Sequence, residues 1–168
     1  MEIEKKYLIK NIPFSLEGYE HHEISQGYIS TSPVIRIRKK DDMNILTIKG
    51  GGLSVREEYE LPITDEEYIS LSEKISGNLI EKTRYLIPDN QFENKSSLLT
   101  IELDIFHGVF KGLIYAEVEF PDEESMKKYN PPAFFDREVT EDFNFTNASL
   151  SEMQSSEIND FLRGLGIS

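Results

Sequence analysis

Charged residues recur at every second position along much of this chain, and this alternation constrains the fold more than any other feature. A period of two is typical of β-strands, because successive side chains point to opposite faces. Glu2 and Glu4 flank Ile3, and Arg36 and Arg38 flank Ile37. The same alternation returns near residues 45–49, 55–61, 82–84, 100–105 and 115–120, and a short strand is expected at 26–30. These segments predict about eight strands, a number that can close a small barrel.

The charges on the shared faces are grouped by sign. Eight are carboxylates, at Glu2, Glu4, Glu58, Glu60, Glu102, Asp104, Glu117 and Glu119. Seven are cations, at Lys6, Arg36, Arg38, Lys49, Arg56, Lys82 and Arg84. A solvated polar face is the ordinary explanation on one or two strands. Recurrence on most strands, in Glu-x-Glu and Arg-x-Arg pairs, favours a barrel that is polar and ion-filled inside and apolar outside.

This arrangement predicts the direction of individual side chains. Glu4, Arg38, Lys82 and Glu117 are expected to point into a common lumen. Their apolar neighbours on the other face are expected to pack outward under helices, at Ile3, Ile37, Leu103 and Val118.

Helices are expected to be few. They are predicted at Asp65–Ser76 with Thr64 as N-cap, from Pro121 to about Tyr129, from Ala148 to Gln154 with Asn147 as cap, and at Ser156–Leu165. The predicted fold class is therefore α+β and mainly antiparallel β. It is an approximately eight-stranded closed β-barrel with a charged lumen and helices packed outside.

Composition narrows the class of protein. A length of 168 residues predicts one domain, spanning residues 1–168. The net charge of −13 argues against nucleic-acid and membrane-surface partners. The chain has no cysteine, which excludes disulfides, zinc–thiolate sites and a cysteine nucleophile. With no apolar signal core after Met1, we expect a cytoplasmic protein.

The paired charges also predict chemistry. Carboxylates two positions apart on a strand lie about 7 Å from each other, and two such pairs on neighbouring strands crowd like charges. A divalent cation relieves this repulsion, and oxygen ligands select Mg²⁺ or Mn²⁺. The Arg-x-Arg and Lys-x-Arg pairs form a cationic wall suited to a polyphosphate.

The order of these motifs resembles the CYTH domain, also called the triphosphate tunnel metalloenzyme family. The chain opens with Glu2-Ile3-Glu4-Lys5-Lys6, a Glu-x-Glu-x-Lys motif. There follow Arg36-Ile37-Arg38, Thr47-Ile48-Lys49-Gly50, Arg56-Glu57-Glu58-Tyr59-Glu60, Lys82-Thr83-Arg84, Glu102-Leu103-Asp104 and Glu117-Val118-Glu119. The likeness extends from Glu2 to about Leu150 and is greatest to bacterial stand-alone tripolyphosphatases.

The resemblance implies metal-dependent hydrolysis of a triphosphate-containing small molecule inside a β-tunnel, most simply of inorganic tripolyphosphate. It implies that Glu2, Glu4, Glu117 and Glu119 hold Mg²⁺ or Mn²⁺, with Asp104 as a further ligand or a partner of one. By the same resemblance Lys6, Arg36, Arg38, Lys49, Arg56, Lys82 and Arg84 bind phosphates. Tyr28 matches a tyrosine of the bacterial members that works with the motif lysine, here Lys6, in catalysis. A homodimer is one expected assembly.

Several alternatives stay open at this point. Adenylate cyclases and thiamine or nucleoside triphosphatases use the same tunnel, although the chain lacks both tryptophan and the His-Phe pair that precedes the first motif in cyclase-type members. A non-catalytic polyphosphate or nucleotide sensor is an alternative of another class, and the intact carboxylate pairs disfavour it. Glu58, Glu60 and Glu102 fit either metal ligation or ion pairs within the tunnel.

Overall fold

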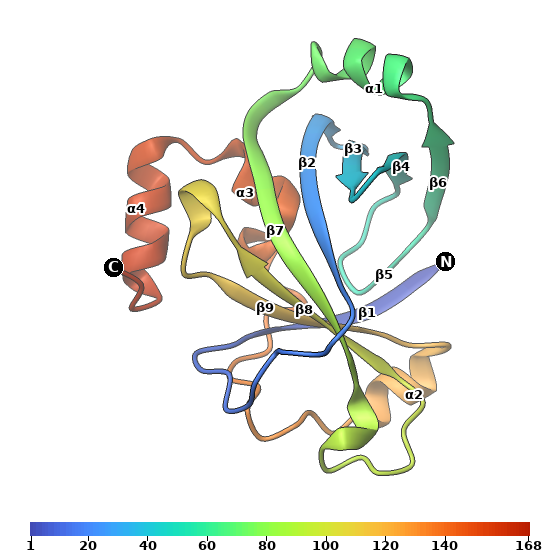
Figure 1. Cartoon of the computed structure of the whole chain (residues 1–168), viewed down its shortest axis with the longest axis vertical. Helices are drawn as coiled ribbons and strands as arrows, with labels where there is room; N and C mark the ends of the chain where they lie inside the picture. Colours follow the sequence, from blue (N-terminus) through green and yellow to red (C-terminus); the bar gives the residue numbers. More distant parts are fainter.

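A computed structural model describes all residues from 1 to 168 and shows one antiparallel sheet of nine strands curled into a barrel (Figure 1). The strands are β1 (Glu2–Leu8), β2 (His21–Thr31), β3 (Val34–Lys40), β4 (Met43–Lys49), β5 (Val55–Arg56), β6 (Glu58–Ile63), β7 (Ser76–Pro88), β8 (Thr100–Phe106) and β9 (Ile114–Glu119). Their order around the wall is β5-β1-β9-β8-β7-β2-β3-β4-β6. The predicted α+β fold class and the charged barrel are confirmed.

The barrel closes through the short segment that contains β5 and β6. β5 pairs with β1 at one end of the sheet order, and β6 pairs with β4 at the other end. Only Glu57 separates these two strands in the sequence. The alternation across residues 55–61 predicts one strand here, whereas the structure has two strands with different partners, so the wall contains nine strands rather than eight.

Helices cover the outside and one end of the barrel (Figure 1); the first three are shorter than expected, and the last has the expected length. They are α1 (Asp65–Ser72), α2 (Glu123–Lys128), α3 (Asn147–Glu152) and α4 (Ser155–Gly164), with single turns of 3₁₀-helix at Asp89–Gln91, Gly108–Phe110 and Phe143–Phe145. Thr64 caps α1 in a capping box with Glu67, as its position predicted. The cap of α3 is Thr146 rather than Asn147, because the Thr146 hydroxyl accepts from the amide of Ser149.

The outward-facing apolar residues form a core between the wall and its covering segments. Ile3, Leu103 and Val118 lie in one buried cluster, against which Met126 of α2 and the nearby Tyr129 pack. Ile37 is also fully buried. The predicted outward packing is therefore confirmed for Ile3, Leu103 and Val118, which lie under α2 and adjacent segments.

A second buried cluster fills one end of the barrel. Tyr28, Phe106 and Tyr115 contribute to it from the wall, and Leu150 of α3 and Ile158 of α4 contribute from the helices. In Figure 1, α3 lies beside β7 and β2, and α4 lies farther out, near the turn at Gly108–Phe110; both are on the side of the molecule away from β6.

None of the helices is long and apolar enough to cross a membrane.

Candidate active site

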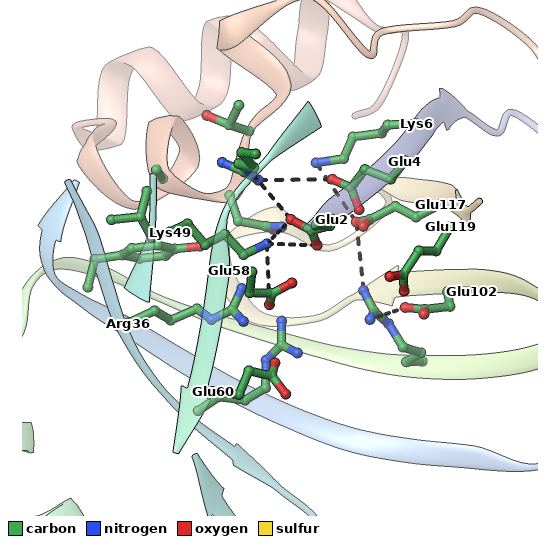
Figure 2. Close-up of a pocket in the computed structure, with 18 residues that line it drawn as sticks. Glu2, Glu4, Lys6, Arg36, Lys49, Glu58, Glu60, Glu102, Glu117 and Glu119 are labelled. Atoms are coloured by element: carbon green, nitrogen blue, oxygen red, sulfur yellow. Dashed lines mark hydrogen bonds and ion pairs between the residues drawn. The ribbon is translucent and has the colours of Figure 1, made fainter. Parts of the chain in front are cut away.

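The barrel encloses a charged cavity of about 270 Å³ (Figure 2). Its walls carry seven carboxylates and six cations. The carboxylates are Glu2, Glu4, Glu58, Glu60, Glu102, Glu117 and Glu119, and the cations are Lys6, Arg36, Arg38, Lys49, Arg56 and Arg84. Tyr28, Val34, Thr146, Asn147 and Ala148 complete the lining. Strands distant in sequence therefore bring nearly all the predicted site residues to one cavity.

Strands β1 and β9 supply the most concentrated negative charge. They pair in a register that sets Glu4 opposite Glu119 and Lys6 opposite Glu117. Because alternate side chains of a strand share a face, all four side chains point into the barrel from the same part of its wall. The direct pairing of Glu4 with Glu119 is unfavourable without a cation, since like charges directly opposite each other repel.

Glu2 already has partners within the protein. Its carboxylate accepts from Lys49 Nζ at 3.0 and 3.1 Å and from Arg56 Nε at 3.3 Å. Burial alone would raise the pKa of Glu2, but Lys49 and Arg56 lower it below its usual value. Glu2 is therefore ionised at neutral pH and holds two of the tunnel cations.

Glu4 is in the opposite situation. Its nearest cation is Arg56, with Nη2 at 3.9 Å from Oε1. Burial and the negative charges of Glu117 and Glu2 raise the pKa of Glu4 to about 8. Burial and the neighbouring Glu102 and Glu2 likewise raise the pKa of Glu119. Both carboxyl groups therefore lack adequate compensation by the protein's own cations.

Glu117 lies between the two charge types. Lys6 Nζ is 3.8 Å and Arg84 Nη2 is 3.7 Å from its Oε1. Burial opposes ionisation, yet Lys6 and Arg84 hold the pKa of Glu117 well below its ordinary value. Its buried Oε1 accepts no hydrogen bond from the protein. An ionised oxygen with a free acceptor position thus faces Glu4.

The opposite wall contains cations without acidic partners. Arg36 is buried and donates through Nη2 to Thr47 Oγ1 at 3.2 Å, while its Nε has no partner. Arg38 donates through Nε to Gln26 Oε1 at 2.9 Å. Burial, Arg36 and Arg84 lower the pKa of Arg38 to about 9, which shows how poorly its charge is compensated. A guanidinium keeps its proton in proteins, so this wall requires an anion.

Two predicted residues lie inside the barrel but beneath the surface of the cavity. Lys82 and Asp104 are fully buried and pair at 2.7 Å. Asp104 also accepts two hydrogen bonds from Arg84, from Nε at 2.7 Å and from Nη2 at 2.8 Å. Lys82 shares the inward face of β7 with Arg84, and Asp104 shares the inward face of β8 with Glu102, but neither Lys82 nor Asp104 reaches the surface of the cavity.

Lys6 and Tyr28 both line the cavity. Lys6 Nζ donates to the carbonyl oxygen of Phe145 at 3.3 Å and lies 5.1 Å from the centre of the Tyr115 ring. The hydroxyl of Tyr28 accepts from Gln26 Nε2 at 3.2 Å. Both side chains are buried and therefore held in defined positions.

The carboxylates whose roles were left open take different positions. Glu102 forms an ion pair with Arg84. Glu58 lies 3.9 Å from Lys49 Nζ, and burial raises its pKa to about 7 despite that lysine. Glu60 lines the cavity without an ion pair. Glu102 and Glu58 therefore sit beside tunnel cations.

Sequence reasoning missed three polar residues around the cavity: Gln26, Thr47 and Asn147. Gln26 and Thr47 are fully buried and bind the two arginines of β3. Asn147 lines the cavity, and its buried Oδ1 has no hydrogen-bond partner. The alternation gives a signal for the first, because Gln26 shares the phase of Tyr28. Its pairing with Arg38 depends on the register of β2 against β3.

Curated proteins similar to this chain have a single described activity. This chain is 36% identical over 157 residues to a protein of Nitrosomonas europaea named inorganic triphosphatase. The alignment covers 89% of this chain and 96% of the relative. An inorganic triphosphatase of Acetivibrio thermocellus is 35% identical over 156 residues, covering 89% of this chain and 92% of the relative. No protein-family model matches the sequence.

A solved structure agrees with these relatives. The crystal structure of the inorganic triphosphatase NE1496 matches with a TM-score of 0.64 and 30% identity, over 92% of this chain and 96% of that one. Likeness at this identity and coverage, together with the charged cavity inside the barrel, identifies the chain as a member of the triphosphate tunnel metalloenzyme family, among the inorganic triphosphatases.

Proposed function

We propose that this protein hydrolyses inorganic tripolyphosphate inside its barrel with the help of a divalent cation. One observation carries the proposal: the charges that lack partners are separated by sign across one cavity. Arg36 and Arg38 are uncompensated cations on β3, whereas Glu4 and Glu119 are uncompensated carboxyl groups on β1 and β9. A triphosphate would compensate the charges of the two arginines, and its metal ion would compensate those of the two carboxyl groups. The names of the relatives support this substrate.

The cationic wall would hold the phosphate chain. Arg36 and Arg38 have free donors toward the cavity, and Lys49, Arg56 and Arg84 can share their present carboxylate partners with a phosphate. Guanidinium groups suit this task because their planar donors match phosphate oxygens. Lys82 is too buried to contact the substrate. We propose that Lys82 and Asp104 hold Arg84 in position, since Asp104 forms ion pairs with both cations.

The acidic wall fits a hard divalent cation in its chemistry. Its donors are all carboxylate oxygens, Glu117 Oε1 has an unused acceptor position, and the raised pKa of Glu4 indicates missing positive charge. No group of three acidic or histidine side chains already converges as a ligand set. We therefore propose that Glu2, Glu4, Glu117 and Glu119 would hold Mg²⁺ or Mn²⁺ after side-chain adjustment.

A bound divalent cation would neutralise phosphate oxygens and lower the pKa of a water molecule that attacks a terminal phosphorus. The residues of the chain itself supply position and electrostatic stabilisation. Arg36 and Arg38 orient the phosphates, and Lys6 and Tyr28 donate hydrogen bonds to oxygens that gain negative charge in the transition state. We assign Lys6 and Tyr28 as the catalytic residues on this basis.

Further features of the proposal follow from the sequence. We propose that residues 1–168 act as one tunnel domain whose partner is a triphosphate-containing small molecule. Homodimer formation, and the lack of nucleic-acid and membrane partners, remain predictions.

The proposal is tested by phosphate release from tripolyphosphate, ATP, thiamine triphosphate and pyrophosphate, each with Mg²⁺ and with Mn²⁺. We expect tripolyphosphate to be the best substrate, with no release when the cation is chelated by EDTA. Equal release with and without EDTA would contradict the metal requirement. A clear preference for an organic triphosphate would contradict the proposed substrate.

A further inference from the structure

Gln26 occupies an unusual position next to the cavity. It is an uncharged polar residue that lies in β2 directly opposite Arg38 of β3. Its side chain is fully buried. It does not line the cavity, yet it contacts two residues that do, Arg38 and Tyr28. Any influence of Gln26 on the reaction must therefore act through these neighbours.

The direction of each hydrogen bond around Gln26 is fixed by the chemistry of the groups. Arg38 Nε can only donate, so the atom of Gln26 that lies 2.9 Å away must be the amide oxygen. The amide nitrogen then faces the hydroxyl oxygen of Tyr28 at 3.2 Å. An amide nitrogen can only donate, so the Tyr28 oxygen accepts this hydrogen bond.

The Tyr28 hydroxyl is therefore left with a proton to donate elsewhere. It makes no other hydrogen bond within the protein, and its side chain lines the cavity. The charge of Arg38 thus sets the orientation of the Gln26 amide, and this amide sets the role of the tyrosine. The chain of contacts runs from Arg38 to Gln26 to Tyr28 and ends at the cavity.

We propose that Gln26 is a positioning residue that makes the Tyr28 hydroxyl an obligatory hydrogen-bond donor to a phosphate oxygen and couples it to Arg38. This inference rests on the proposed function of the cavity. A hydrogen bond to an ionised oxygen is worth about 10- to 150-fold in rate when it forms in the transition state. Gln26 would thus affect kcat without contacting the substrate.

The substitution Gln26→Glu tests the direction of the hydrogen bonds with little change in shape. A carboxylate accepts from Arg38 as the amide oxygen does, but it also accepts from Tyr28. The tyrosine proton then turns toward Glu at this position and away from the cavity. We expect kcat for tripolyphosphate to fall about 10- to 100-fold, close to the loss caused by Tyr28→Phe.

A double-mutant cycle separates this effect from a merely structural one. The partial neutralisation of Arg38 by the new carboxylate should raise KM with or without the tyrosine hydroxyl. In the Tyr28→Phe background, however, Gln26→Glu should have almost no further effect on kcat, because the hydroxyl that it reorients is absent. Tyr28→Phe also serves as the matched control for the size of the kcat loss.

Three results would overturn the proposal. They are an unchanged kcat in Gln26→Glu, an unchanged kcat in Tyr28→Phe, and losses in kcat that multiply fully in the double variant. If Gln26→Glu does not fold, Gln26→Met removes both hydrogen bonds at similar volume, and its kcat loss should again be absent in the Tyr28→Phe background. Failure of the wild-type protein to hydrolyse any triphosphate would instead contradict the proposed function.

Discussion

Glu4 faces two other carboxylates, Glu2 and Glu117, and its nearest cation is 3.9 Å away. Glu2 on the same strand is held by Lys49 and Arg56. Residues of one sequence motif thus have different partners: a metal ion would have to share Glu2 with Lys49 and Arg56, whereas Glu4 has only a distant cation. The effects of substitution should differ accordingly.

Replacing the uncompensated carboxylates should remove activity without unfolding the protein. Glu4→Gln keeps the shape of the side chain and removes a proposed metal ligand, so we expect tripolyphosphate turnover to be lost, and the same holds for Glu119→Gln. The measurement is phosphate release at limiting Mg²⁺, with circular dichroism to check the fold. The exposed Glu66→Gln of α1 is the control and should behave as the wild type. Wild-type activity in either site variant would reject that residue as an essential ligand.

The raised pKa of Glu4 makes a prediction about stability. A carboxyl group with a pKa of about 8 in the folded state and 4.5 in the unfolded state binds its proton more tightly when folded. Its contribution therefore destabilises the folded protein increasingly as pH rises from 4.5 to 8. In EDTA at pH 8, Glu4→Gln should raise the free energy of unfolding by on the order of 3 kcal/mol. The difference should vanish near pH 5 in urea titrations, and equal stability of both proteins at pH 8 would contradict the assignment.

Arg38 should contribute to phosphate binding rather than to recognition of an organic group. Its guanidinium has no acidic partner, and charge-assisted hydrogen bonds contribute about 1.5–3 kcal/mol each. Arg38→Ala should therefore lower kcat/KM by about 10- to 150-fold, to a similar degree for tripolyphosphate and for ATP. Lys39→Ala, at the neighbouring exposed position of β3, is the control. A loss confined to ATP would show that Arg38 reads the nucleoside.

At the level of single residues, the sequence predicted the cavity well and its internal pairing poorly. Alternation within a strand shows which residues share a face, as for Glu2 and Glu4. It does not show which cation of another strand meets them, because that depends on register across the barrel. Lys82 faces inward with Arg84, as the alternation predicts, but its ion pair with Asp104 keeps it beneath the cavity surface, which the alternation does not show. The dependence on register also explains why Gln26, without charge, was overlooked.

Among the elements, the strands were easier to predict than the helices. Period-two charge patterns located most of the wall, but β7 extends from Ser76 to Pro88, far beyond the charged part around Lys82. The predicted end of α1 at Ser76 was too late, since the helix ends at Ser72 and β7 begins soon afterwards. Ile75 continues the helical spacing of apolar residues but lies beyond the end of α1. Its side chain packs over Gly27 of β2, and this contact explains why an apolar residue stands there.

The helix α4 should matter for stability rather than for chemistry. Its Ile158 is buried in the cluster that fills one end of the barrel, away from the charged walls. Ile158→Ala should lower the free energy of unfolding by about 2–5 kcal/mol, which urea denaturation would measure. The control is Ile69→Ala on α1, where the side chain is largely exposed and the expected change is within about 0.5 kcal/mol. Equal effects of the two substitutions would show that α4 does not seal the barrel.

For the molecule as a whole, local geometry outweighs net charge. The chain carries −13 overall, yet its cavity combines six cations with seven carboxylates. Exposed charges are screened over about 8 Å at physiological salt, so the outer acidic surface has little influence on a phosphate chain inside the barrel. An acidic protein can therefore bind a polyanion, provided that a cation accompanies it to the acidic wall.

Nothing in the cavity wall is specialised for a base, a ribose or a thiamine ring, whereas six cations suit phosphates. Phosphorus NMR of the products formed from tripolyphosphate and from ATP, each with Mn²⁺, distinguishes a triphosphatase from a cyclase. We predict phosphate and pyrophosphate in equal amounts from tripolyphosphate, at a rate at least equal to that of ATP hydrolysis. Cyclic AMP and pyrophosphate from ATP, with no phosphate from tripolyphosphate, would contradict the proposed function.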